Sequence, residues 1–275
     1  MKLFATDLDG TLLDRDGGIH PRDARAIESA MQRDVVVTIA TGRLTSGTHH
    51  VARALKLTAP IVCADGGVTA CARTEAILDR KPVPTTEVDP ILSTILRRGL
   101  ASFVFTHDAI HSCEKGVDHH AYVRGWSPNI TTHADVLDAR AWRETPDSAV
   151  MVLGIGNEEA VRSVERWIAE ACPTLDTLTF SFERSGAWVV RIVASGVSKG
   201  AALEALAARL GIAQRDTAVI GDWLNDLSMF GWAGRSYAMP HAAEQVKLAA
   251  THRLDEASCK RGAIADALED FLGGG

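Results

Sequence analysis

The chain has 275 residues, of which 46% are hydrophobic and 23% are charged, so it can bury the core of one large or two modest domains. Its net charge of −6 lacks the basic surplus that draws a protein to nucleic acid or to an anionic membrane, and we expect neither partner. The five cysteines are scattered without the paired spacing of a zinc or redox site, and no apolar run approaches the ~18 residues of a membrane span. We therefore expect a cytoplasmic protein with reduced thiols, as a monomer or a small homo-oligomer.

The first part of the chain alternates strands and helices, as in a parallel α/β unit. Short apolar runs predict strands at 2–6, 35–40 and 60–64, and apolar positions at helical spacing predict helices at 21–33 and 51–55. Each strand ends in a polar, glycine-rich turn. Open parallel sheets bind their ligands at such carboxyl ends.

The pattern changes after residue 81. A hairpin is predicted because 177–183 alternates apolar and polar residues and Arg184, Ser185 and Gly186 turn the chain into the strand at 187–193. Residues 115–147 stay unassigned. The other predicted elements are helices at 87–98 and 158–171 and strands at 102–106, 110–113 and 148–155.

The first pattern returns at Ser198, which is a good N-cap for a helix that ends near Gly211 and is followed by an apolar strand at 217–220. We therefore predict an α/β fold with a Rossmann-like parallel-sheet core. The core consists of residues 1–81 and 190–275, and residues 82–189 form an inserted α+β domain.

Charged side chains collect at the predicted strand ends and helix starts: Asp7, Asp9, Lys199, Asp222 and Asp226. Burying an unpaired carboxylate costs several kcal/mol, so these carboxylates need solvent or a cation. Oxygen ligands and negative charge indicate a hard cation, and Mg²⁺ fits. Lys199 lies near a helix N-terminus, where cations are disfavoured, and this favours a bound anion over a solvated lysine.

Four short motifs occupy these positions: Asp7-Leu8-Asp9-Gly10-Thr11, Thr41-Gly42-Arg43, Ser198-Lys199-Gly200 and Gly221-Asp222-x-x-Asn225-Asp226. In this order they resemble the motifs of the haloacid dehalogenase (HAD) superfamily, in its Cof-type sugar-phosphatase branch with a large α/β cap. The resemblance covers both core segments. It implies a HAD core with the inserted domain as a cap. It also implies a Mg²⁺-dependent phosphatase that hydrolyses a small phosphomonoester, such as a sugar phosphate, through an aspartyl-phosphate.

The resemblance also implies roles for individual residues. Asp7 is the nucleophile, and Asp9 is the acid that protonates the leaving oxygen and the base that later activates water. The expected phosphate-binding residues are Leu8, Thr41, Gly42, Lys199 and Asn225. The expected Mg²⁺ ligands are Asp7, the carbonyl of Asp9, and Asp222. Asp226 acts through water or orients its neighbours.

Several residues depart from the family pattern. Asp65 stands where relatives usually have asparagine, and it is left out of the phosphate-binding set. Trp223 replaces a small residue, and Pro240-His241 stands where Gly-Asn is frequent. Substrate specificity is expected in the cap. The candidate specificity residues are Arg43 and Trp223 from the motifs, and His119, His120 and Arg124 from polar clustering alone.

Other functions share part of this chemistry. A phosphomutase on a related sugar phosphate needs the same nucleophile. A haloacid dehalogenase has no use for the second acid at Asp9. A phospho-receiver switch also joins Asp, Mg²⁺, Thr and Lys on an α/β sheet, but it needs neither the insertion nor Asp9. Steady release of inorganic phosphate separates an enzyme from a switch.

Overall fold

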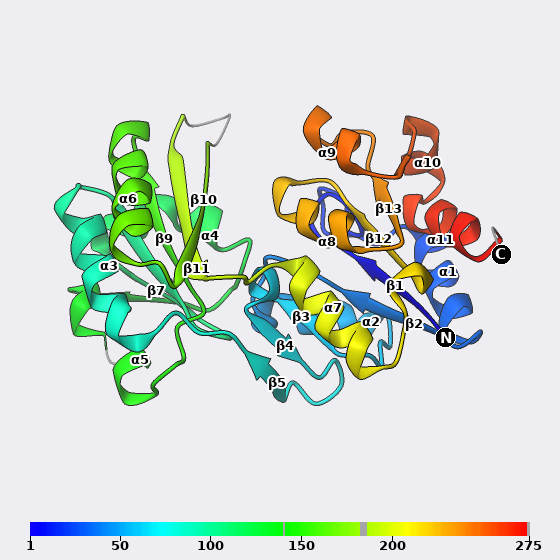
Figure 1. The fold of residues 1–275 in the computed structure, drawn as a ribbon, viewed down its shortest axis with the longest axis horizontal. Coiled ribbons are helices and arrows are strands. Elements are labelled where there is room, and N and C mark those ends of the chain that lie inside the picture. The colour runs from blue at the N-terminus through cyan, green and yellow to red at the C-terminus, as the bar shows by residue number, and fades with distance from the viewer. Residues whose placement is uncertain (140, 182–185, 274–275) are drawn as a thin grey trace. The chain divides into compact units, whose positions relative to one another are not determined.

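A computed structural model describes residues 1–139, 141–181 and 186–273. The chain divides into two compact units (Figure 1). Unit 1 comprises Met1–Gly42, Thr48–Leu78 and Ser198–Gly275, and unit 2 comprises Arg43–Gly47 and Asp79–Val197. The insertion expected over 82–189 therefore continues to Val197, because the strand at its end pairs within the sheet of unit 2.

A parallel sheet of five strands, in the order β14-β13-β12-β1-β2, forms the centre of unit 1. The strands are β1 (Lys2–Thr6), β2 (Val35–Ile39), β12 (Thr217–Gly221), β13 (Arg235–Ala238) and β14 (His252–Arg253). Thr6 lies opposite both Ile39 and Ile220, so the carboxyl ends of β1, β2 and β12 meet at one edge. Segments from the two ends of the chain thus share one sheet, as the split core predicted.

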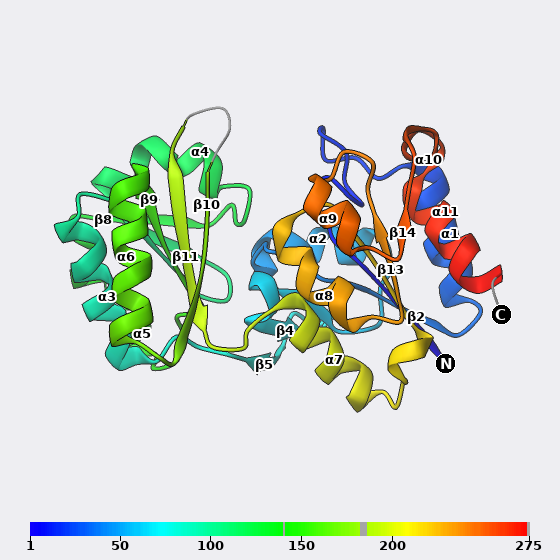
Figure 2. The ribbon, with the colours of Figure 1, turned by 45° about the horizontal axis from the view of Figure 1, so that its top comes forward.

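Helices cover both faces of this sheet, which explains why its strands are almost continuously apolar. Leu3 and Ala5 pack with Leu203 in one apolar cluster, whereas the ring of Phe4 lies 6.4 Å from that of Phe271. Figure 2 shows α1 and α11 side by side. The helices of unit 1 are α1 (Pro21–Met31), α2 (Thr45–Ala54), α7 (Lys199–Arg209), α8 (Leu227–Trp232), α9 (Glu244–Ala249), α10 (Glu256–Arg261) and α11 (Ala263–Gly273), and the first residues of α2 belong to unit 2.

The third predicted strand has a different partner from the one expected. β3 (Ile61–Cys63) belongs to a separate three-stranded sheet with β4 (Val68–Ala70) and β5 (Ile77–Arg80). A parallel bridge between Ala40 and Val62 joins β3 to the end of β2. The turn after β3 therefore still lies beside the end of β2.

Unit 2 is built on a six-stranded sheet with the order β10-β11-β9-β6-β7-β8, in which β7 and β8 are parallel and the other pairs are antiparallel. Figure 1 shows α3 (Thr85–Arg97) and α6 (Glu158–Ala171) on one face of it. The strands are β6 (Ala101–Phe105), β7 (Ile110–Cys113), β8 (Ile130–His133), β9 (Met151–Gly156), β10 (Leu175–Ser181) and β11 (Trp188–Ala194).

The stretch that the sequence left unassigned, 115–147, contains β8, α4 (His120–Val123) and α5 (Ala141–Glu144). The predicted hairpin strands agree with β10 and β11, whereas Phe182, Arg184 and Ser185 lie outside the described residues. All five cysteines are free thiols. Within the described part of the chain, no helix combines the length and apolarity needed to cross a membrane.

A buried carboxylate links α1 to α11. Asp23 is 3% exposed, and its Oδ1 accepts a hydrogen bond of 2.8 Å from the backbone nitrogen of Ala265 in the first turn of α11. Arg22 pairs with Asp266 and Glu269 on the same helix. Since the first-turn amides of a helix have no partner within the helix, Asp23 acts as a cap supplied from α1.

We predict that Asp23→Ala lowers the free energy of unfolding by about 1–2 kcal/mol, because it leaves the Ala265 amide buried without an acceptor. Asp23→Asn keeps an acceptor oxygen and should cost less. Urea denaturation followed by circular dichroism measures both variants. Equal losses for the two variants would contradict a capping role.

Candidate active site

Lys199 is the first residue of α7, and its side chain is fully buried. The ammonium donates to Asp7 Oδ1 at 2.6 Å and to Asp226 Oδ1 at 2.7 Å, so one cation joins the end of β1 to the turn after β12. Ser198 caps the helix as predicted, because its hydroxyl accepts from the backbone nitrogen of Ala201. Gly66 has φ +100°, and a Cβ there would lie 2.2 Å from the Ser198 carbonyl oxygen, so glycine lets the turn after β3 approach the start of α7.

Asp226 has no exposed surface, and both of its oxygens have partners. Oδ1 accepts from Lys199, while Oδ2 accepts from the backbone nitrogens of Asp222 at 2.8 Å and Trp223 at 2.9 Å. Asp226 therefore holds the turn after β12 in place.

Asp222 is held by residues from two other loops. Its Oδ1 accepts from the hydroxyl of Thr11 at 3.0 Å, and its Oδ2 lies 3.4 Å from His241 Nε2. The Asp222 carboxylate raises the pKa of His241, and the nearby backbone of Gly10 adds to this effect. Gly10 has φ +75°, and a Cβ there would lie 2.6 Å from Asp222 Oδ2. Sequence reasoning missed Thr11 and His241, and the only signal for His241 was its departure from the family pattern.

One carboxylate oxygen from each of Asp7, Asp222 and Asp226 lies within 4.8 Å of the other two. Three carboxylates and one ammonium leave a net charge of −2 in this cluster if all are ionised. A divalent cation would balance that charge, and carboxylate oxygens are the ligands that hard divalent cations prefer. The donor set therefore fits such a cation.

The pKa values of the cluster are shifted by burial and by the same excess of negative charge. Burial raises the pKa of Asp7 well above its ordinary value, and although Lys199 opposes this, Asp226 and Asp222 add to it. Burial alone would lower the pKa of Lys199, but the Asp226 and Asp7 carboxylates reverse the effect and raise it. Lys199 thus stays protonated.

The remaining motif residues lie at the adjoining strand ends. Thr41 is buried and follows β2. Its backbone amide donates to the Val62 carbonyl at 2.9 Å, and its carbonyl accepts from the backbone nitrogen of Asp65 at 3.0 Å. Leu8 is fully buried, whereas Asp9 is exposed. Asp9 thus differs from Asp7 and Asp226, which are buried.

Asp65, which the sequence analysis left out, lies in the site through Asn225. It is 5% exposed, its φ is +54°, and its Oδ1 accepts from Asn225 Nδ2 at 2.7 Å. Asn225 Oδ1 is buried and has no hydrogen-bond partner among the described residues. The NH2 group of Asn225 has two hydrogens, and the bond to Asp65 uses one of them.

Four of the five candidate specificity residues belong to unit 2. Arg43 donates to the Gly47 carbonyl at 3.2 Å. His120 lies 2.9 Å from the Ser112 hydroxyl, with its ring edge against Phe103, so it also serves the packing of unit 2. His119 is partly buried, and Arg124 is exposed. The fifth, Trp223, is 43% exposed in unit 1.

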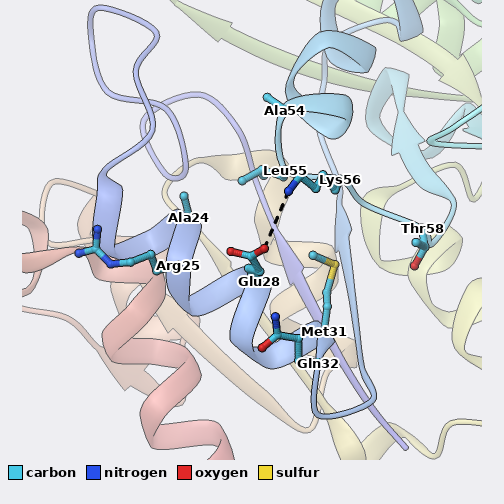
Figure 3. A pocket seen from close by; sticks show the side chains of 9 residues that line it. All are labelled: Ala24, Arg25, Glu28, Met31, Gln32, Ala54, Leu55, Lys56 and Thr58. Atoms are coloured by element: carbon cyan, nitrogen blue, oxygen red, sulfur yellow. Dashed lines mark ion pairs between the residues drawn. The ribbon is translucent and has the colours of Figure 1, made fainter.

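A surface pocket between α1 and the end of α2 is lined by none of the motif residues (Figure 3). Its polar feature is an ion pair of 3.9 Å between Lys56 and Glu28. None of the residues lining it was predicted as a site residue. The catalytic candidates therefore remain those at the strand ends.

The chain is similar to known proteins over nearly its whole length. A family model described as haloacid dehalogenase-like hydrolase matches residues 4–268. The chain is 24% identical over 271 residues to an HMP-PP phosphatase of Escherichia coli, covering 98% of this chain and 96% of the relative. It is 26% identical over 278 residues to a 5-amino-6-(5-phospho-D-ribitylamino)uracil phosphatase of Bacillus subtilis, covering 90% of each.

Solved structures show the same fold. A haloacid dehalogenase-like hydrolase from Bacteroides thetaiotaomicron has a TM-score of 0.79 at 22% identity, with 98% of each chain covered. The HAD subclass IIB sugar phosphatase BT4131 has a TM-score of 0.77 at 19% identity, with 99% of each covered. Because the family model spans nearly the whole sequence, this chain belongs to the haloacid dehalogenase-like hydrolase family.

Proposed function

We propose that the chain is a Mg²⁺-dependent phosphatase that hydrolyses a small phosphomonoester through an aspartyl-phosphate on Asp7. The observation that carries the proposal is the fully buried Lys199 ammonium between Asp7 and Asp226, with Asp222 beside them. The sequence relatives are named as phosphatases of HMP-PP and of a phosphoribitylaminouracil, and a structural neighbour as a sugar phosphatase. These names support a small phosphorylated metabolite as the substrate.

Electrostatic repulsion explains why the Asp7 nucleophile needs two cations, Lys199 and Mg²⁺. A carboxylate that approaches a phosphate dianion is repelled by roughly 8 kcal/mol at ~4 Å and an effective dielectric of ~20. Lys199 offsets part of this repulsion. Asp7, Asp222 and the carbonyl of Asp9 would hold Mg²⁺, which supplies the remaining positive charge near the transferred phosphoryl group.

The proposed reaction has two steps. An oxygen of Asp7 attacks phosphorus, and the bond from phosphorus to the leaving oxygen breaks while Asp9 donates a proton to that oxygen. Asp9 then takes a proton from water, whose oxygen attacks phosphorus and releases Asp7. The backbone of Leu8 and Gly42 and the side chain of Thr41 would hold the phosphoryl oxygens. Lys199 and Asn225 complete that set.

Unit 2 contains no motif residue apart from Arg43, so we assign substrate choice to it. The candidates remain Arg43, His119, His120, Arg124 and, in unit 1, Trp223. A cytoplasmic location and a monomer or small homo-oligomer belong to the same proposal.

A phosphomutase on a related sugar phosphate is the second candidate, since it uses the same nucleophile. It would pass the phosphoryl group to another hydroxyl of the sugar. Release of one inorganic phosphate for each substrate consumed favours the phosphatase.

We predict that Asp7→Asn reduces phosphate release from a generic phosphomonoester to below about 1% of wild type, because an amide is a poor nucleophile. A phosphate-release assay with Mg²⁺ measures this, circular dichroism checks the fold, and Asp16→Asn at an exposed position is the control. A variant that keeps a tenth of wild-type turnover loses only ~1.4 kcal/mol and would exclude Asp7 as the nucleophile.

We predict that Asp9→Asn still forms the phosphorylated protein but turns over about 10²–10⁴-fold more slowly, since general acid–base catalysis is worth that much. Rapid quenching followed by intact-protein mass spectrometry detects the phosphoryl adduct. Unchanged turnover would remove Asp9 from the mechanism.

A further inference from the structure

We propose that His241 is a positioning residue for the Mg²⁺ site, tying the loop after β1 to Asp222. This inference rests on the Mg²⁺ site of the proposed function. His241 follows β13, which lies next to β12 in the sheet, and β12 lies next to β1. The imidazole thus comes from a third strand end and contacts the loops of the other two.

Two contacts place the ring. Its Nε2 lies 3.4 Å from Asp222 Oδ2, and the backbone of Gly10 lies close to the ring. Thr11, the residue after Gly10, donates to the other oxygen of Asp222 at 3.0 Å. One carboxylate oxygen is therefore held from the loop after β1 and the other is contacted from the loop after β13. A side chain at Gly10 would collide with Asp222 Oδ2, so the approach is as close as the backbone allows.

The contact matters because the proposed ligands lie on these two loops. Asp9 precedes Gly10, and its carbonyl is the proposed backbone ligand, while Asp222 supplies a carboxylate. A ring that binds both loops fixes the separation and orientation of the two ligands before a cation arrives. Groups that orient metal ligands in this way commonly change metal affinity by 10–100-fold when removed.

The test is isothermal titration of purified full-length protein with MgCl₂. His241→Ala should raise the Kd for Mg²⁺ about 10-fold. His241→Asn keeps an N–H donor and should fall between Ala and wild type. His252→Ala is the matched control, because His252 is also half-exposed and lies 3.8 Å from a carboxylate, that of Asp270, away from the site. The control should bind Mg²⁺ as wild type does.

Two further readouts separate positioning from simple structural support. The melting temperature of Mg²⁺-free His241→Ala should match that of His252→Ala, and kcat should recover at saturating Mg²⁺ while the Mg²⁺ needed for half-activation rises. An unchanged or lower Kd in His241→Ala, with Mg²⁺ binding by the wild type, would overturn this inference alone. A wild type that takes up no Mg²⁺ would overturn the proposed metal site as well.

Discussion

The buried ammonium of Lys199 is the interaction on which the site depends. Taking a lysine and two carboxylates out of water costs several kcal/mol for each ion, and the structure offsets this with contacts of 2.6 and 2.7 Å. Asp226 is stabilised further because it accepts two backbone N–H groups of the turn that carries Asp222. One cation thus organises the end of β1, the start of α7 and the turn after β12.

The same arrangement leaves an excess of negative charge, and groups from the surrounding loops contact the carboxylates that carry it. The Asp222 carboxylate accepts a hydrogen bond from the Thr11 hydroxyl and lies beside the His241 imidazole. Because residue 10 is glycine, the loop after β1 can approach this carboxylate closely. These contacts hold the carboxylates in place without neutralising all of them. A divalent cation would complete the charge balance, so that a phosphate ester meets a site without excess negative charge, and metal binding would thereby be coupled to catalysis.

The sequence predicted the fold class and most of the site because the motif residues directly follow apolar strands or begin a helix, as Asp7 and Lys199 do. It could not predict contacts that depend on strand order. His241 reaches Asp222 only because β13 lies next to β12. Likewise, β3 pairs with the strand Val68–Ala70 in a separate small sheet. A strand of three residues is too short for its sequence pattern to predict it. The end of the insertion was placed too early because the apolar run at Trp188–Ala194 suits a strand of either unit.

The most direct test of this account is a double-mutant cycle between Lys199 and Asp226, measured by urea denaturation. Lys199→Met alone should lower the free energy of unfolding by roughly 3–5 kcal/mol, because it leaves carboxylates buried without their cation. Adding Asp226→Asn removes one of those charges, so the double variant should be no less stable than Lys199→Met, with a coupling energy of about 1–3 kcal/mol. Losses that simply add would contradict the claim that Lys199 and Asp226 form one electrostatic unit.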